Sequence, residues 1–146
     1  MSHPDLEIRR AGPADITLIR TIDSRLEADP GHARFVARVL DMGESWLALV
    51  GGAPAGYALV SRQFFDRPFV DTLVVGQAHR RRGVAQALMS RCETAHDDDR
   101  LFTSTNRSNR PMRALLAKTG WRGSGVIHNL DPDDPELVFV KFRPPA

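Results

Sequence analysis

Cysteine, lysine and tyrosine are scarce in this chain. Its single cysteine, Cys92, excludes a disulfide framework and any metal site built from several cysteines. No apolar run approaches the ~18 residues that a membrane-spanning helix needs, and the first ten residues lack the apolar stretch of a signal peptide. We therefore expect a cytoplasmic protein without a membrane partner and without a metal ion.

The chain is otherwise of ordinary globular composition. It has 146 residues, of which 42% are hydrophobic and 26% are charged, and it contains no linker, repeat or low-complexity segment. The sequence thus predicts one domain spanning residues 1–146. The net charge is only +2 and no aromatic residues lie between the clustered basic ones, which argues against nucleic-acid binding through the arginines at 80–82, 107, 110 and 113.

Hydrophobic periodicity predicts a mixed α/β fold. We expect strands at residues 6–10, 45–50, 54–64, 69–75, 101–105, 121–130 and 136–142. We expect helices beginning at Pro13 (with Ile16, Ile19, Ile22 and Leu26 on one face) and at residues 33–42, 84–95 and 111–119. Hairpin connections indicate antiparallel neighbours, whereas the strand–helix–strand unit of residues 69–105 requires a parallel pair. The sheet is therefore predicted to be mostly antiparallel with one parallel step.

The most informative segment is the basic turn, residues 76–85, between a predicted buried strand and a predicted helix. The first N–H groups of a helix lack intrahelical partners and attract anions. Gly83 and Ala85 lack bulk, so a phosphate can approach the backbone, and Arg80, Arg81 and Arg82 add positive charge. The segment is thus either a pyrophosphate-binding turn or a solvated basic turn, and it lacks the lysine of a P-loop and the three glycines of a dinucleotide fingerprint.

Two spacings carry a family resemblance. The segment LVVGQAHRRRGVAQALM contains Arg80-x-x-Gly83-x-Ala85, which resembles the acetyl-coenzyme A signature of the GNAT superfamily of N-acetyltransferases, although Gln77 replaces a usual proline. A second pattern of that family, an asparagine followed eleven residues later by glycine and an aromatic residue, matches Asn109 and Gly120-Trp121. The resemblance implies the acyltransferase fold of that family, with helices on both faces of the sheet and a splayed pair of parallel strands.

The resemblance also implies an acetyl-coenzyme A site. The backbone of Leu73, Val74 and Val75 would pair with the pantetheine arm, and the amides of residues 81–85 would hold the pyrophosphate. The residues concerned at the turn are Arg80, Arg81, Arg82, Gly83, Val84 and Ala85. Asn109, or less directly Asn106, would contact the pantetheine arm, while the alternative for Asn109 is a helix cap before Pro111.

The implied reaction is direct attack of a neutral amine on the thioester. The N–H of Val75 is the candidate that stabilises the oxyanion. Asp71 shares a strand face with Leu73 and Val75 and is the candidate base, acting through water, although a merely hydrogen-bonded aspartate is the alternative. His128 and Glu136 are further candidates for the base.

The chain departs from the family pattern at the general acid. The usual tyrosine, seven residues after the asparagine, is replaced by Leu116. The single tyrosine, Tyr57, lies in an apolar strand and is expected to pack in the core. Ser108 or a water molecule is the candidate substitute, and a thiol whose pKa is around 8.5 also leaves tolerably as a thiolate.

The acceptor is the least specified partner. The early helices and the last interstrand loop, which build the acceptor side in the family, are acidic and would attract a cationic amine. The acidic residues are Asp23, Glu27, Asp29, Asp41, Glu44, Asp131, Asp133, Asp134 and Glu136. We expect an N-acetyltransferase acting on a small molecule, peptide or protein amine. The alternative is an acyl-coenzyme A-binding module with little turnover, and a homodimer is left open.

Overall fold

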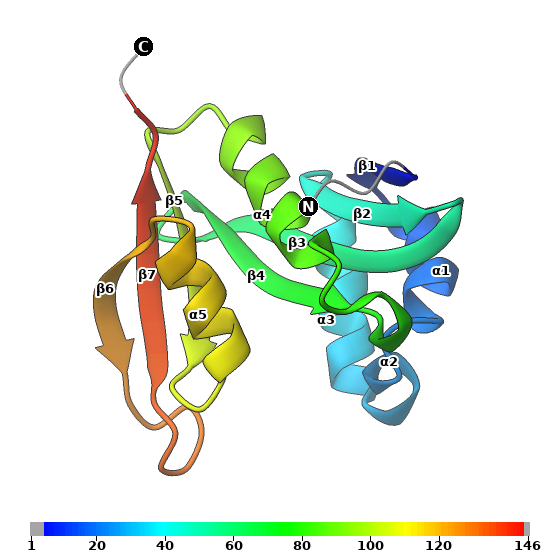
Figure 1. Ribbon diagram of the computed structural model, residues 1–146. Helices are drawn as coiled ribbons and strands as arrows, with labels where there is room; N and C mark the ends of the chain where they lie inside the picture. Colours follow the sequence, from blue (N-terminus) through cyan, green and yellow to red (C-terminus); the bar gives the residue numbers. More distant parts are fainter. Residues whose placement is uncertain (1–4, 145–146) are drawn as a thin grey trace. The chain divides into compact units, whose positions relative to one another are not determined.

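The fold is a mixed α/β arrangement, given by a computed structural model that describes residues 5–144 (Figure 1). These residues form a seven-stranded sheet in the order β1-β2-β3-β4-β5-β7-β6. The strands are β1 Leu6–Ala11, β2 Ser45–Val50, β3 Ala53–Phe64, β4 Arg67–Val75, β5 Arg100–Asn106, β6 Arg122–Ile127 and β7 Glu136–Phe142. The α-helices are α1 Ile16–Arg20, α2 Arg25–Ala28, α3 Pro30–Asp41, α4 Val84–Ala95 and α5 Arg110–Lys118, and short 3-10 helices are η1 Pro13–Asp15 and η2 Gln77–His79.

Strand direction confirms the predicted fold class. The pairs β1–β2, β2–β3, β5–β7 and β6–β7 are antiparallel, and β4 and β5 are parallel through Phe69–Phe102 and Val70–Thr103. The described residues divide into two compact units. The first contains residues 5–61 and 71–95, and the second contains residues 62–70 and 96–144, so that β3 and β4 each contribute to both. The single domain expected from the sequence stays a prediction.

The first unit has helices on both faces of its strands (Figure 1). Because side chains alternate along a strand, neighbouring residues of β3 face opposite helices. A Cβ at Gly56 would lie 3.2 Å from side-chain atoms of Val84 and Leu88, both in α4. The next residue, Tyr57, belongs instead to the core that the α1–α3 side shares with β2 and β3. That core consists of Ala11, Ile19, Leu26, Val36, Val39, Leu40, Leu47, Leu49, Tyr57 and Leu59.

The first predicted helix is interrupted, which corrects the sequence-based expectation. It ends at Arg20, and a separate short helix begins at Arg25. Asp23, between them, is buried and accepts hydrogen bonds from the backbone and side chain of Arg25, so a local side-chain contact replaces continued helix. The third helix begins three residues earlier than predicted, at Pro30, because the Asp29 carboxylate accepts the N–H groups of Gly31 and His32.

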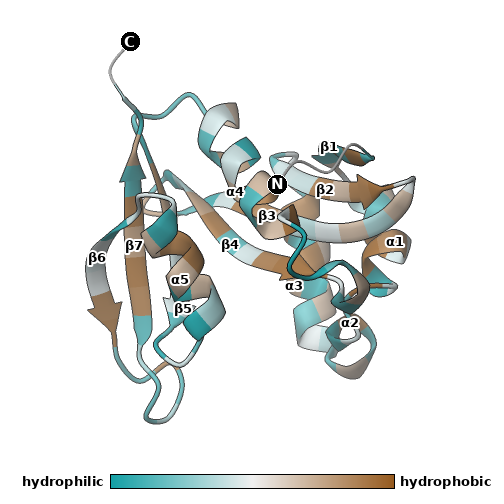
Figure 2. Cartoon of the chain, in the orientation of Figure 1, coloured by the Kyte–Doolittle hydropathy of each residue, from teal (hydrophilic) through white to brown (hydrophobic). Residues whose placement is uncertain are grey.

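Turn chemistry explains two further differences. β4 begins at Arg67 rather than Phe69, because Phe65 and Asp66 form the turn with φ values of 54° and 62°. β6 is shorter than predicted, since it ends at Ile127 and positive φ values at Asn129 and Asp133 lead into a loop. Every residue of β6 is exposed, and Figure 2 shows its apolar end in brown.

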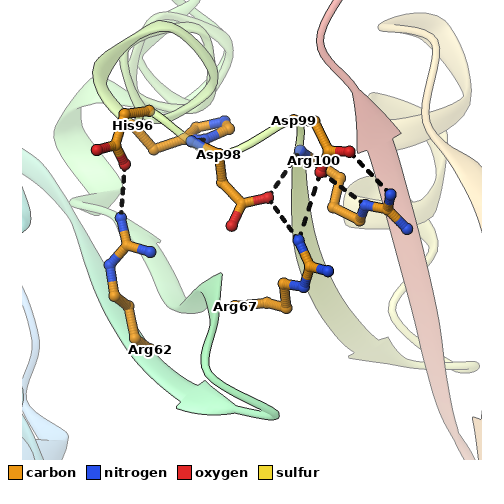
Figure 3. Close-up of polar contacts among 7 residues, drawn as sticks. Arg62, Arg67, His96, Asp98, Asp99 and Arg100 are labelled. Carbon is orange, nitrogen blue, oxygen red and sulfur yellow. Dashed lines mark hydrogen bonds and ion pairs between the residues drawn. The ribbon is translucent and has the colours of Figure 1, made fainter.

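The second unit is held at one end by the acidic turn, residues 97–99, that follows α4. Asp97 pairs with Arg62 at 3.2 Å and Asp98 with Arg67 at 2.9 Å. Asp99 pairs with Arg100 at 2.8 Å and also accepts from Arg67 (Figure 3). These contacts join the β3–β4 turn to the start of β5. Exposed ion pairs contribute little individually, so this network orders the turn more than it stabilises the unit.

Residues 5–144 contain neither a helix suited to crossing a membrane nor a cluster of metal-ligating side chains. None of the helices in this range combines the length and apolarity needed to cross a membrane. Nor does any group of three or more histidine, cysteine or carboxylate side chains in the same range have the arrangement of a metal site.

Candidate active site

The basic turn of the first unit has the backbone geometry of an anion-binding site. It follows β4, and the N–H of Gly76 donates to Ala55 O at 2.7 Å. Arg81 and Gly83 have positive φ values of 63° and 81°, so the backbone changes direction at two residues immediately before α4. The first α4 hydrogen bond runs from Ala87 N to Gly83 O at 3.0 Å, which leaves the N–H groups of the preceding turn without intrahelical partners. Such a run of N–H groups forms a concave anion site.

The side chains of this turn add charge without occupying the site. Arg80, Arg81 and Arg82 are exposed, and within residues 5–144 their only side-chain hydrogen bond joins Arg80 Nε to Val75 O at 3.3 Å. Figure 2 shows much of the connection between β4 and α4 as hydrophilic. A left-handed conformation at Arg81 is unfavourable for a residue with a side chain. Strain of this kind concentrates at ligand-binding turns, which fits an anion site better than a solvated cap.

The end of β4 is packed closely by two glycines. A Cβ at Gly56 would lie 2.8 Å from Val74 O, and a Cβ at Gly76 would lie 2.9 Å from Ile22 Cγ2. Any larger residue would push β3 or residue 22 away from this backbone. Leu73, Val74 and Val75 are half-buried. The roles predicted for them, pairing with the pantetheine arm and stabilising the oxyanion, stay predictions.

Asp71 has the environment of a proton acceptor. Burial raises the pKa of its carboxyl, while a hydrogen bond from Ser61 and the positive charge of Arg38 oppose that shift. Its Oδ2 is buried and has no hydrogen-bond partner among the described residues. A carboxylate with a raised pKa and a free oxygen is a stronger base than an ordinary aspartate. The Asp71 carboxyl is therefore partly hydrogen-bonded, which agrees with the alternative interpretation of this residue given above. It is still able to accept a proton.

The candidate site residues of the second unit form hydrogen bonds with other residues of that unit. Asn109 caps α5, since its side-chain oxygen accepts Met112 N at 3.2 Å, which confirms the helix-cap interpretation and leaves the side-chain NH2 group available. Asn106 Nδ2 donates to Asp131 Oδ2 at 2.8 Å. Ser108 Oγ donates to Asp134 Oδ2 at 2.6 Å, so its proton points to a carboxylate in this arrangement. The functional roles of these three residues stay predictions.

The other candidates for proton transfer have structural explanations. Leu116, which stands where the family has a tyrosine, is fully buried. Tyr57 is also fully buried, as expected, and donates its hydroxyl to Asp23. Glu136 accepts a hydrogen bond from Ser104 Oγ at 2.6 Å, and His128 is exposed in the loop after β6.

Sequence reasoning missed a buried polar cluster centred on Asp23. Asp23 was expected on an acidic rim, but only 5% of it is exposed. Arg25 donates to both carboxylate oxygens at 3.0 and 2.9 Å, Tyr57 donates its hydroxyl, and His32 Nε2 lies 3.2 Å from Oδ2. Burial by itself would raise the pKa of Asp23, but these hydrogen bonds hold it well below its usual range. The one available signal was a lone tyrosine in an otherwise apolar strand.

The structure combines a mixed sheet that has a parallel strand pair with a turn suited to phosphate binding between a strand and a helix. This combination is found in the class of coenzyme A-dependent acyltransferases. Residues 17–121 match the family model described as "Acetyltransferase (GNAT) family". The chain therefore belongs to the GNAT acetyltransferase family, which supports acyltransferase activity. A comparison with curated proteins finds no match.

Solved structures agree with this assignment. A GNAT-family acetyltransferase from Bacillus cereus ATCC 10987 is 26% identical, with a TM-score of 0.87 over 96% of this chain and 99% of that one. The ribosomal-protein-S18-alanine N-acetyltransferase from Escherichia coli is 18% identical, with a TM-score of 0.76 over 92% of each chain. Diaminobutyrate acetyltransferase from Paenibacillus lautus, solved with its substrate L-2,4-diaminobutyric acid and coenzyme A, is 19% identical, with a TM-score of 0.73 over 97% and 98%. The last two show the shared fold alone.

Proposed function

We propose that this protein transfers the acetyl group of acetyl-coenzyme A to a primary amine of a small molecule, peptide or protein. The observation that carries the proposal is the basic turn of a GNAT-family chain, in which Arg81 and Gly83 curl the backbone before the free N–H groups of α4. A pyrophosphate fits this arrangement because both the backbone dipoles and the neighbouring guanidinium groups favour negative charge.

The coenzyme contacts follow from the turn and the end of β4. The amides of residues 81–85 would hold the pyrophosphate, with Arg80 and Arg82 adding charge. The backbone of residues 73–75 would bind the pantetheine arm. The amide groups of Asn106 and Asn109 remain further candidates for that arm, and no metal ion takes part in this proposal.

The chemical step is direct attack. The amine nitrogen forms a bond to the thioester carbonyl carbon, and the carbon–sulfur bond breaks. The amine loses its proton to Asp71 through a water molecule, which the raised pKa of that carboxyl favours. The N–H of Val75 would stabilise the oxyanion. The electron pair leaves with sulfur, and the thiolate departs as such or takes a proton from water or Ser108.

The acceptor is defined only as an amine. Among the structural neighbours, the names specify an alanine of ribosomal protein S18 in one case and L-2,4-diaminobutyric acid in another, so we keep both protein and small-molecule amines as candidate acceptors. We expect activity without a membrane or nucleic-acid partner. The alternative, a module that binds acyl-coenzyme A with little turnover, is favoured by one observation, the buried Leu116 in place of a tyrosine.

The two proposals are separated by a thiol-release assay with acetyl-coenzyme A. The amine panel comprises spermidine, L-2,4-diaminobutyric acid, kanamycin, an N-terminal alanyl peptide and a lysyl peptide. Release of free thiol that depends on one of these amines supports the transferase. Thermal stabilisation by acetyl-coenzyme A without thiol release supports the binding module, and the absence of both overturns the coenzyme assignment. Ser108→Ala tests the general acid, since a changed alkaline limb of the rate profile is expected only if Ser108 donates a proton.

A further inference from the structure

The Asp23 cluster links three elements of the first unit to one carboxylate. Its donors come from β3 (Tyr57), from the start of α2 (Arg25) and from the first turn of α3 (His32). Only 4% of the Asp23 side chain is exposed, against 57% of the Arg25 side chain, so the cluster is sealed on one side and open to solvent at the guanidinium. All the hydrogen bonds converge on a residue that belongs to no helix or strand.

The segment that Asp23 fixes has little structure of its own. Residues 21–26 follow a helix of five residues and include the first two residues of a helix of four. Helices this short do not persist in isolation, because nucleation is costly. The position of residues 21–26 therefore depends on side-chain anchors, and Asp23 supplies several at one point. Leu26 adds an apolar anchor, whereas Thr21, Ser24 and Arg25 are exposed.

The same segment touches the backbone proposed to carry the reaction. Ile22 packs on Gly76, where an added Cβ would lie 2.9 Å from Ile22 Cγ2. Gly76 directly follows Val75, and its N–H is bonded to Ala55 O, two residues before Tyr57. The hydrogen bond between Tyr57 and Asp23 therefore holds residues 21–26 next to the end of β4. A shift of residues 21–26 changes the surface beside Val75 at Gly76, the first residue of the basic turn, whereas Arg81 and Gly83 lie further along that turn.

We propose that Asp23 is a positioning residue for the acceptor amine: through Tyr57, Arg25 and His32 it fixes residues 21–26 as the wall against which the amine is placed beside Val75. The inference rests on the proposed function. It goes beyond it by naming Asp23 as the residue that fixes this segment and by predicting that amine binding and coenzyme binding respond separately to its loss. A misplacement of about 1 Å in a positioning group costs up to ~10²-fold in rate.

The test compares Tyr57→Phe with Arg9→Gln. The first variant removes one donor to Asp23 and keeps the aromatic ring. The second breaks the pair of Arg9 with Asp15, another buried carboxylate of the same unit, across a contact of 2.8 Å. Both variants are studied at a temperature where they are equally folded, and His32→Asn provides a second probe of the cluster if Tyr57→Phe does not fold.

Two readouts decide the outcome. In Tyr57→Phe, hydrogen exchange should rise in residues 21–26, and KM for the best amine of the panel should rise about tenfold while KM for acetyl-coenzyme A stays within about twofold. Arg9→Gln should show neither change. Equal rises in both KM values, or equal behaviour of the two variants, overturn the positioning role while leaving the proposed function intact. A wild-type protein that acetylates no amine overturns both.

Discussion

The hydroxyl of Tyr57 donates a hydrogen bond to the carboxylate of Asp23, and both groups are buried. The only tyrosine of the chain thus serves as a donor to a buried charge. Burial raises the pKa of this phenol, and the hydrogen bond to Asp23 raises it further. The hydroxyl therefore keeps its proton at any pH at which the enzyme works, and Tyr57 is unsuited to act as the general acid that the family usually provides elsewhere.

Tyr57→Phe should destabilise the protein by about 1.5–3 kcal/mol, the range for a hydrogen bond to a charged group. The ring still fills the core, so the loss is confined to the hydroxyl. Urea unfolding followed by circular dichroism measures it. Leu59→Val, a fully buried position two residues along the same strand, controls for general sensitivity of the core. A loss below about 0.5 kcal/mol would show that the Asp23 contact is energetically unimportant.

Protonation of Asp23 should make the stability of the protein depend on pH in the acidic range. Its folded pKa is held well below the unfolded value of about 3.9, so its stabilising contribution is fully present above that value and is lost as pH falls through the folded pKa. The advantage in Tm of the wild type over Asp23→Asn should therefore be constant at neutral pH and shrink below about pH 4. Thermal unfolding from pH 7 to pH 2 measures the difference, and an advantage that persists unchanged to pH 2 would contradict this account.

Asp71→Asn should raise the stability of the protein at neutral pH and lower its activity. Burial raises the folded pKa of Asp71, so ionisation costs stability as pH rises through the range between the unfolded and folded values. The variant should consequently be more stable than the wild type at neutral pH but not at pH 3, while kcat falls about 10²–10⁴-fold. A kcat close to that of the wild type would remove Asp71 as the base. The acid limb of the wild-type rate profile should lie above the usual aspartate pKa.

Leu116→Tyr should damage the core rather than restore an acid. Leu116 is fully buried on α5, whereas its neighbour Leu115 is only half-buried. Adding bulk to a packed core costs about 1–3 kcal/mol, so Leu116→Tyr should lower the free energy of unfolding by that amount, and Leu115→Tyr by less. Urea denaturation of both variants checks the order, and equal stability of Leu116→Tyr and the wild type would show that a tyrosine can be accommodated there.

The sequence predicted the parts of the site that depend on local patterns. Gly83, which the sequence marks as a residue without bulk in the turn, has a positive φ that glycine adopts readily, and α4 begins at Val84 as its periodicity indicates. Most strands lie within two residues of their predicted bounds because apolar alternation determines which face is buried.

Features that depend on tertiary contacts were not predictable in this way. The positive φ of Arg81 has no residue signature, since arginine has no preference for that conformation. Asp23 looks like an ordinary acidic residue in a helical pattern until β3 brings Tyr57 to it. The raised pKa of Asp71 likewise results from packing around the strand.

The most direct test of the account is the thermal shift produced by acetyl-coenzyme A in Gly83→Glu. The matched control is Gly43→Glu, because Gly43 has the same backbone conformation (φ 80°) in the same unit but lies outside the basic turn. At a coenzyme concentration about 100 times Kd, binding stabilises a protein by about 2.7 kcal/mol. The wild type and Gly43→Glu should show this stabilisation, and Gly83→Glu should not, because its side chain brings bulk and negative charge to the pyrophosphate site. An equal shift in all three proteins would contradict the assignment of residues 76–85 as the coenzyme-binding turn.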